Sequence, residues 1–179
     1  MAVFSADTDA TLRAAVTLAN SALAPETMTT LDELARFYRR FGYSGRRDGD
    51  AAELTAVRNL RPRLRELLTS DAERAAEIVN AMLTEARAVP QLVRHEPYGW
   101  HIHAVERDDA LATRIQVEIA MAMIDVVRAG ELSRLGVCAN DDCEGIVLDL
   151  SRNRSRRFCS TACGNRHAAA AYRARAASA

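Results

Sequence analysis

The chain has 179 residues, of which 49 % are apolar and 27 % are charged, so an intrinsically disordered chain is excluded. That length suits one medium domain together with a small module that needs outside help to fold. No run of about 18 apolar residues is present. The acid-bearing N-terminal stretch lacks the basic start of a signal peptide, so we expect a cytoplasmic protein without a membrane span.

Charge is divided sharply along the chain, although the formal net charge is zero. Residues 1–150 contain 17 arginines and all 24 acids, a balance of −7, whereas residues 151–179 contain seven arginines and no acid. There is no lysine, so every basic side chain except histidine is a guanidinium that can fork onto a phosphate or a carboxylate. This asymmetry favours an acidic body with a basic arm that meets a polyanion; a solvated tail that touches nothing is the alternative.

Apolar residues recur at helical spacing through most of the first 130 positions. The segments that this spacing predicts as helices are 7–23, 30–41, 51–68, 70–86 and 108–128. Asp7 or Thr8 is expected to cap the first helix and Thr30 the second, because their side chains can accept backbone N–H groups. Pro62 should kink or break the third helix.

Between residues 89 and 105 polar and apolar side chains alternate around the turn-like run EPYG, which predicts a two-stranded hairpin. His101 and His103 would point to the same side of a strand, as a two-histidine metal or ligand site requires. No third ligand is evident, so a solvated strand face is the favoured interpretation. The sequence has no glycine-rich phosphate loop, nucleophile elbow or paired-acid motif, so we expect no catalytic residues and no enzymatic activity.

The four cysteines of the chain fall into two close pairs. They are Cys138, Cys143, Cys159 and Cys163. The pattern C-x4-C, fifteen residues, C-x3-C is typical of a four-cysteine zinc site. Disulfides are rare in the cytoplasm, and four thiolates leave no open coordination position, so the pattern predicts one structural Zn²⁺ ion. An iron–sulfur cluster and reduced buried cysteines are the alternatives.

The residues around the cysteines predict how this part folds. GIVLDLS (145–151) alternates like a strand, and RRFC (156–159) is expected to return beside it as a second strand, with Phe158 packed near the metal. Cys159 and Cys163 lie four residues apart and would project from one face of a following helix. A knuckle, a hairpin and a helix whose first turn carries two ligands describe a treble-clef-like finger.

The expected fold class is therefore mainly α with a small β-hairpin (α+β), followed by this treble-clef-like zinc finger. The body is expected over residues 1–135 and the finger over residues 136–179.

Two parts of the chain resemble known families. The runs CANDDC and LDLSRNRSRRFCSTACGNRHAAAAYRAR resemble the CGNR-type zinc finger, which is named for the tetrapeptide that begins at Cys163. The order of TLRAAVTLAN, VNAML, WHI and the long helix before the finger is similar to the N-terminal ABATE domain. Members are described as stress-induced transcription regulators of bacteria, so the resemblance implies a DNA-reading finger and a sensor body. Phe158 stands where a tryptophan is expected, and the last two cysteines are one residue closer than is usual.

Basic and polar side chains of the finger are the candidates for contact with a polyanion, because guanidinium groups pair bidentately with phosphates and guanine edges. The candidate nucleic-acid-binding residues are Arg152, Arg154, Arg156, Arg157, Asn165, Arg166, His167, Arg173 and Arg175. Arg152 and Arg154 are the favoured free cations. Arg166 has the structural alternative of neutralising the thiolates, and Asp149 is expected to pair with a neighbouring arginine.

Together these observations predict a transcription regulator whose finger reads double-stranded DNA and whose body binds a small-molecule effector that no residue identifies. A homodimer fits this prediction, because one finger of this size buries little DNA surface and two half-sites add up. Two alternatives stay open: an RNA- or ribosome-associated zinc protein, and a protein-interaction module whose basic finger docks an acidic partner.

Overall fold

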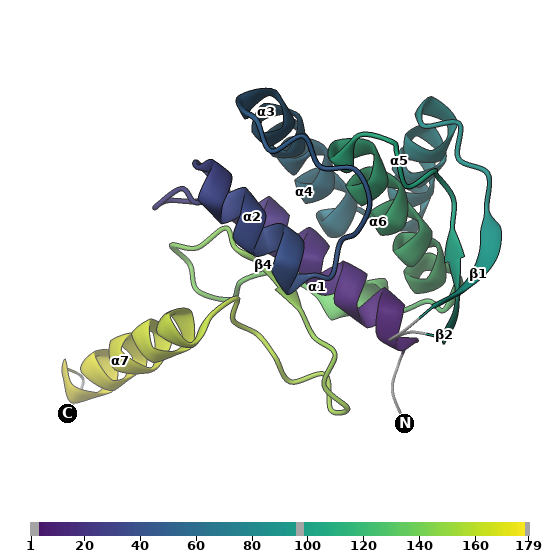
Figure 1. Cartoon of the computed structure of the whole chain (residues 1–179). Helices are drawn as coiled ribbons and strands as arrows, with labels where there is room; N and C mark the ends of the chain where they lie inside the picture. Colours follow the sequence, from purple (N-terminus) through teal and green to yellow (C-terminus); the bar gives the residue numbers. More distant parts are fainter. Residues whose placement is uncertain (1–3, 96–98, 178–179) are drawn as a thin grey trace.

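The helices of the body form in the segments where apolar spacing predicts them (Figure 1). The computed structural model describes residues 4–95 and 99–177. Its α-helices are α1 (Ala6–Asn20), α2 (Leu31–Arg40), α3 (Ala51–Asn59), α4 (Arg61–Thr69), α5 (Ala72–Glu85), α6 (Leu111–Arg128) and α7 (Thr161–Ala177). The predicted long helix over 51–68 is divided into α3 and α4, because Pro62 stands in the first turn of α4, where its missing N–H costs no hydrogen bond.

Local capping chemistry fixes where the first two helices begin. Thr30 caps α2 as predicted, in a capping box in which Glu33 reaches back to the backbone of Thr30. The predicted cap of α1 is wrong. Ser5 accepts the backbone N–H of Thr8 instead, because Ser5 is the residue in extended conformation.

The core of the body lies between α1, α4, α5 and α6, and α6 runs through its middle (Figure 1). The apolar stripes predicted from the sequence face this core. Its largest fully buried side chains include Leu12, Leu18, Leu64, Leu67, Ile115, Ile119 and Met123. Among the helices of the described residues, none combines the length and hydropathy that a bilayer crossing requires.

The predicted hairpin is present as β1 (Gln91–His95) and β2 (Gly99–His103), an antiparallel pair at one end of the body. Residues 96–98 of its turn lie outside the described residues. His101 and His103 do share one side of β2, but the expectation of a solvated face is wrong for His101, which is buried. Trp100 occupies the solvent side instead, because the alternation that places the histidines inward turns its neighbours outward.

The strand pairing predicted for the finger is also wrong. A short 3-10 turn, η1 (Leu132–Arg134), leads into β3 (Leu135–Val137), and this strand pairs antiparallel with β4 (Ile146–Leu148). Residues 156–159 form no strand. The Asp149 carboxylate accepts the backbone N–H groups of Ser151 and Arg156, at 2.8 and 2.7 Å, so a side chain closes the loop where a ladder was expected.

Candidate metal centre and basic finger

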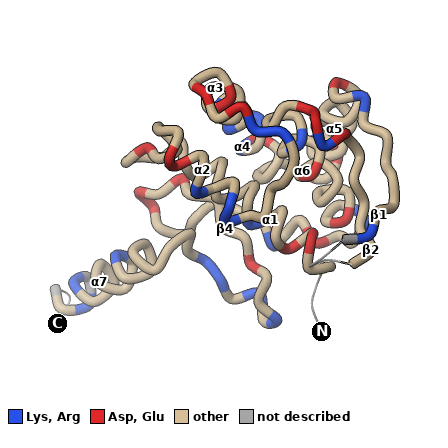
Figure 2. The backbone as a smooth tube through the Cα atoms, viewed as in Figure 1, with Lys and Arg blue, Asp and Glu red and all other residues tan. Residues whose placement is uncertain are grey.

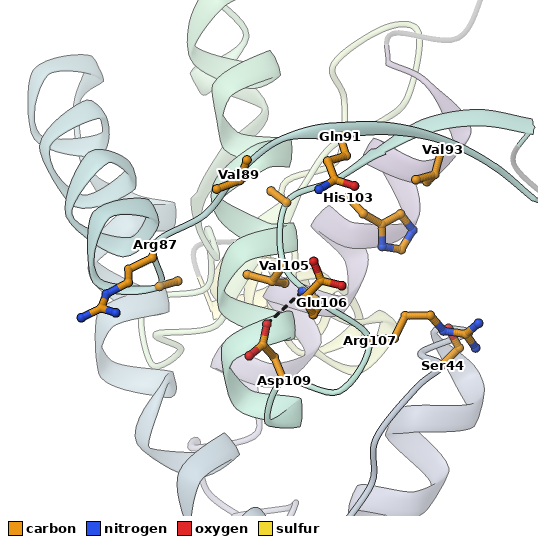
Figure 3. A pocket seen from close by; sticks show the side chains of 13 residues that line it. Ser44, Arg87, Val89, Gln91, Val93, His103, Val105, Glu106, Arg107 and Asp109 are labelled. Carbon is orange, nitrogen blue, oxygen red and sulfur yellow. Dashed lines mark hydrogen bonds between the residues drawn. The ribbon is translucent and has the colours of Figure 1, made fainter.

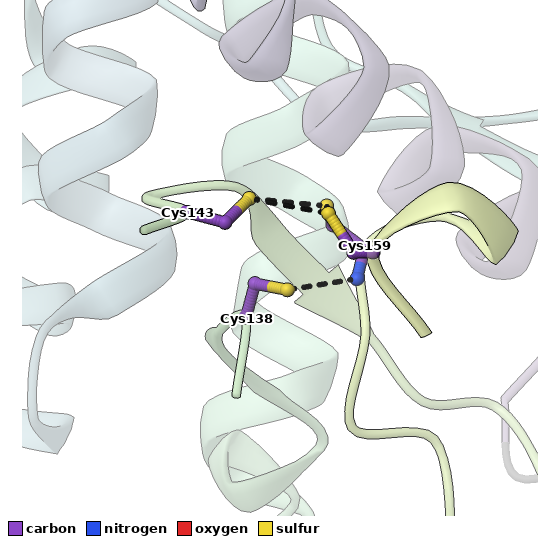
Figure 4. Close-up of side chains that lie close together, drawn as sticks. Cys138, Cys143 and Cys159 are labelled. Atoms are coloured by element: carbon purple, nitrogen blue, oxygen red, sulfur yellow. Dashed lines mark hydrogen bonds between the residues drawn. The ribbon is translucent and has the colours of Figure 1, made fainter. Parts of the chain in front are cut away.

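The two cysteine pairs converge on one point beside β4 (Figure 4). The Sγ atoms of Cys143, Cys159 and Cys163 lie 3.5 Å from one another, and all four thiol sulfurs lie within 4.8 Å. A tetrahedral Zn²⁺ with Zn–S bonds of about 2.3 Å needs sulfur atoms about 3.8 Å apart. The donor set and its spacing therefore fit one structural zinc ion, as predicted.

Backbone hydrogen bonds hold the sulfur atoms in this arrangement. The N–H of Gly145 donates to Cys143 Sγ at 3.4 Å, and the N–H of Cys159 donates to Cys138 Sγ at 3.5 Å. Cys163 lies in the first turn of α7, and its own N–H donates to Ser160 Oγ at 3.2 Å. Cys159 precedes that helix, so α7 carries one ligand in its first turn rather than the two predicted.

The environment of the thiols separates their proton affinities. Burial raises the pKa of Cys159 to about 12, and the neighbouring thiols add to the rise. A hydrogen bond from the Ser160 hydroxyl lowers the pKa of Cys163 to about 6. A metal-free cluster therefore holds protons that zinc displaces when it binds, which makes zinc binding a proton-releasing step.

Arg166 of the CGNR tetrapeptide contacts the cluster directly. Its guanidinium donates to Cys163 Sγ at 3.0 Å, the structural alternative considered from the sequence. Four thiolates on one Zn²⁺ leave a charge of about −2, and a guanidinium at this distance offsets part of it. Phe158 packs against Cys138 and Cys163, as predicted, and its ring lies 5.1 Å from the ring of His167.

Gly145 is a site residue that no motif in the sequence marks. A Cβ atom on this residue would lie 2.6 Å from Cys159 Sγ and 3.3 Å from Cys143 Sγ. Only glycine lets the backbone approach the sulfur atoms this closely. Its position two residues after a knuckle cysteine was the available signal.

Asn20 joins the finger to the body, and no sequence pattern marks it. Its side-chain amide donates to the carbonyl oxygen of Ile146 at 2.8 Å and accepts the N–H of Ile146 at 2.7 Å. Ile146 and Leu148 of β4 belong to the same apolar cluster as the helices of the body. The side chain of the last residue of α1 thus pairs with the backbone of β4 as a neighbouring strand would.

Arg134 is a second joint between body and finger. It is buried, forms an ion pair of 2.7 Å with Glu131, and donates to the carbonyl oxygens of Asp149 and Ser151, each at 3.0 Å. Burial opposes ionisation of Asp149, but hydrogen bonds from the Ser151 side chain and from the backbone N–H groups of Arg156 and Ser151 outweigh it and lower the pKa of this carboxyl. The predicted pairing of Asp149 with an arginine side chain is replaced by these bonds to backbone N–H groups.

The predicted nucleic-acid residues divide into exposed and engaged groups. Arg154 is not the free cation that was predicted, because it forms an ion pair of 2.9 Å with Glu131. Arg156 donates weakly to two carbonyl oxygens, at 3.4 Å, and Arg157 lies 6.0 Å from the Phe158 ring. The side chains that remain exposed without an ion pair among residues 4–95 and 99–177 include Arg152, Asn165, Arg173 and Arg175. Figure 2 shows the basic residues spread along the finger loop and along α7, which projects away from the body.

A cavity of about 690 Å³ lies between the hairpin, the end of α5 and the loop before α6 (Figure 3). Gln91 and His103 reach it from the hairpin, and the Glu106 backbone N–H donates to Asp109 on its opposite side. His103 Nε2 also lies 2.9 Å from His101 Nε2. Acidic and basic side chains both line the cavity, so its charge singles out no class of ligand.

The fold and the cysteine cluster define a zinc-finger protein with a helical N-terminal body. Two family models match the chain in that order: the one described as "Putative stress-induced transcription regulator", ABATE, over residues 12–130, and the CGNR zinc finger over residues 134–176. The chain therefore belongs to the ABATE family and carries a CGNR zinc finger, as the resemblance of its motifs indicated. Neither description names a catalytic activity. No curated protein matches the chain.

Proposed function

We propose that this protein is a cytoplasmic bacterial transcription regulator of stress responses whose zinc finger binds double-stranded DNA. The distribution of charge carries the proposal. Residues 151–179 contain seven arginines and no acid, whereas residues 1–150 carry a balance of −7. The net negative charge of the body disfavours the approach of a long polyanion, so we assign contact with duplex phosphates to the finger. The family description, which names transcription regulation, supports the same reading.

In this proposal Cys138, Cys143, Cys159 and Cys163 each supply one thiolate to the zinc ion. The metal fixes the start of α7 and thereby the direction in which that helix leaves the body. Arg173 and Arg175 then lie on an exposed helix whose side chains can reach phosphates or a major groove. The functional division near residue 135, between a sensor body and a reading finger, is part of the same proposal.

Fluorescence anisotropy with mixed duplex DNA across a salt series tests the proposal. For about four to six phosphate contacts, log affinity should fall with log salt at a slope of roughly −4 to −5. The informative variant replaces Arg152, Arg173 and Arg175 with glutamine, because these exposed residues form no ion pair within the described part of the chain. Affinity should fall at least tenfold, and the slope should become shallower by about three.

A matched control replaces Arg87, Arg94 and Arg107 with glutamine, which changes the net charge equally on the body. This control should bind like the parent chain. Equal losses in both triple variants would mean that charge alone, and not the finger, governs binding. Preferential competition by structured RNA would favour the RNA-associated alternative. Absence of duplex binding at low salt would overturn the proposal and leave the protein-interaction alternative.

The homodimer in this proposal is supported by the outer face of the hairpin. Leu92, Trp100 and Ile102 are 67 %, 64 % and 49 % exposed, and Leu92 lies opposite Ile102 in the strand register. Exposed large apolar side chains that gather on one face of a hairpin favour a protein contact there. Sedimentation of the parent chain should show a dimer, and substitution of Trp100 and Ile102 with serine should give a monomer. A monomeric parent chain at high concentration would remove the dimer from the proposal.

A further inference from the structure

A second cleft, of about 720 Å³, lies where the body meets the finger, between α1, the end of α2 and β4. Four arginines line it from separate segments: Arg13 on α1, Arg39 and Arg40 in the last turn of α2, and Arg156 in the finger. Among the residues that the structure describes, no aspartate or glutamate lines this cleft. In Figure 2 basic segments meet at the end of α2 beside β4.

The cleft arginines are not neutralised by the protein. Across residues 4–95 and 99–177, none of the four forms an ion pair, although the chain has as many acids as arginines. The charge of Arg13 acts on the Asp9 carboxyl, where it partly opposes the rise in pKa that burial causes. Guanidinium groups gathered without counter-charges repel one another, and a bound anion relieves that repulsion.

Two structural roles account for part of this arrangement. Arginines in the last turn of α2 complement the helix dipole. A positive charge near Cys159, which also lines the cleft, offsets the zinc thiolates. Neither role explains all four residues: Arg166 already contacts a thiolate, and the Arg156 guanidinium faces carbonyl oxygens rather than sulfur.

The shape and lining of the cleft indicate what kind of anion it suits. Its volume lies within the range of about 300–1,000 Å³ that is typical of small-molecule sites. Val16, Phe41 and Ile146 supply an apolar wall beside the arginines, and Thr17 and Thr27 add hydroxyl groups. A concave, partly apolar site fits a compact ligand better than it fits the backbone of a stiff duplex.

We propose that this cleft binds a small molecule that carries two or more phosphate groups, with its uncharged part against the apolar wall. The inference gives a chemical class and a place to the effector of the proposed function, yet it does not require that the finger bind DNA. Because the walls come from both α2 and the finger, an occupied cleft ties the two together.

Isothermal titration calorimetry of the zinc-loaded full chain with inorganic pyrophosphate tests this inference. We expect saturable binding, tighter than that of sulfate at equal ionic strength, and a loss of at least tenfold in Arg39→Gln/Arg40→Gln. The matched control, Arg94→Gln/Arg128→Gln, has the same change in charge and also removes an arginine from the last turn of a helix, α6. Its affinity for pyrophosphate should stay within twofold of the parent chain.

Absence of saturable pyrophosphate binding by the parent chain would overturn the inference, as would equal losses in both double variants. If the α2 variant instead weakens only duplex DNA, the cleft belongs to the DNA interface and the small-ligand site is wrong. If the parent chain binds pyrophosphate but does not bind DNA, the small-ligand site in the cleft is supported and the proposed function is wrong. Each variant must retain one zinc; should the double variant lose it, Arg40→Gln alone replaces it, with the same expected direction.

Discussion

The two halves of the zinc finger differ in how they are supported. In the first half, Ile146 and Leu148 are only 1 % and 7 % exposed, because β4 packs into the core of the body. In the second half, nearly all described side chains of α7 beyond Gly164 are exposed. One module thus has an anchored part, which the body and the metal stabilise, and a projecting part, which is available to a partner. Substitutions in the anchored part, at the metal and in the body test that division.

Loss of the metal should have the largest effect. Cys159→Ser is expected to lower the zinc content from one ion per chain to none, because three thiolates no longer close the tetrahedron. Structural zinc contributes on the order of 10 kcal/mol to small fingers, so α7 should lose its fixed start. Zinc analysis and circular dichroism measure both effects. The helices of the body should persist with a lower unfolding temperature; collapse of the entire helical signal would contradict a body that folds without the metal.

Gly145→Ala disturbs the anchored half of the finger at the metal ligands. The added Cβ would lie 2.6 Å from Cys159 Sγ, so a ligand has to move and zinc affinity should fall at least tenfold. Gly136→Ala is the matched control, since nothing lies within 4 Å of the Cβ that it adds. Competition with a chromophoric chelator compares the two variants. Equal affinities would show that the finger relaxes around the extra methyl group.

Asn20→Ala removes the two hydrogen bonds between the end of α1 and β4 without changing a metal ligand. It leaves the N–H and carbonyl of Ile146 without their partner, which should lower the free energy of unfolding by about 2–4 kcal/mol. Asn59→Ala, at an exposed position at the end of α3, should change it by less than about 0.5 kcal/mol. Urea denaturation measures both. If Asn20→Ala is equally neutral, the two hydrogen bonds of Asn20 do not help to hold β4, and the packing of Ile146 and Leu148 is sufficient.

The pH dependence of the body provides the smallest and most selective test. Burial raises the pKa of Glu118 on α6 from its ordinary value of 4.5 to about 7, although the charge of Arg114 opposes the rise. As the pH rises, the unfolded chain loses the Glu118 proton near pH 4.5, whereas the folded protein keeps it until about pH 7. Proton binding by Glu118 therefore favours the folded state at low pH, and this stabilisation is lost as the pH rises from about 4.5 to 7. With a discount for partial exposure, Glu118→Gln should stabilise the protein by about 2 kcal/mol at pH 8 and hardly at all at pH 4.5.

Hydrogen exchange makes the same variant informative about the finger. At pH 8, amides of β4 should gain protection together with α6, because both pack into one core, whereas amides of α7 should not. Equal stabilisation at both pH values would instead point to better packing and not to removal of a charge.

The parts of the fold that were predicted correctly depend on local signals. The helices of the body follow apolar spacing, and the cap at Thr30 and the break at Pro62 involve only near neighbours. The cysteine spacing likewise predicts which four residues form the metal cluster.

The errors arose where distant segments decide the outcome. Strand β3 has only three residues, too few for an alternating pattern that would identify it, instead of RRFC, as the partner of β4. Strand alternation places His101 and His103 on the same side of β2, but it does not indicate which side faces the core. In the sequence Asn20 resembles any residue at the end of a helix, yet its side-chain amide hydrogen-bonds to the backbone of Ile146, 126 positions away. The assignment of nucleic-acid contacts to individual arginines stays a prediction.

The projecting helix has a consequence for how the zinc ion acts at a distance. An isolated alanine-rich helix shorter than about 12–15 residues is marginal in water, because its first turn is costly to nucleate. At 17 residues and with little tertiary support, α7 exceeds that length only slightly. The metal bond at Cys163 supplies that nucleus, so the later turns need only propagate from it. The far turns, which carry Arg173 and Arg175, should fray and re-form rapidly, and warming should shorten the helix from its free end. The ion therefore controls the helicity, and with it the reach, of arginines that it never contacts.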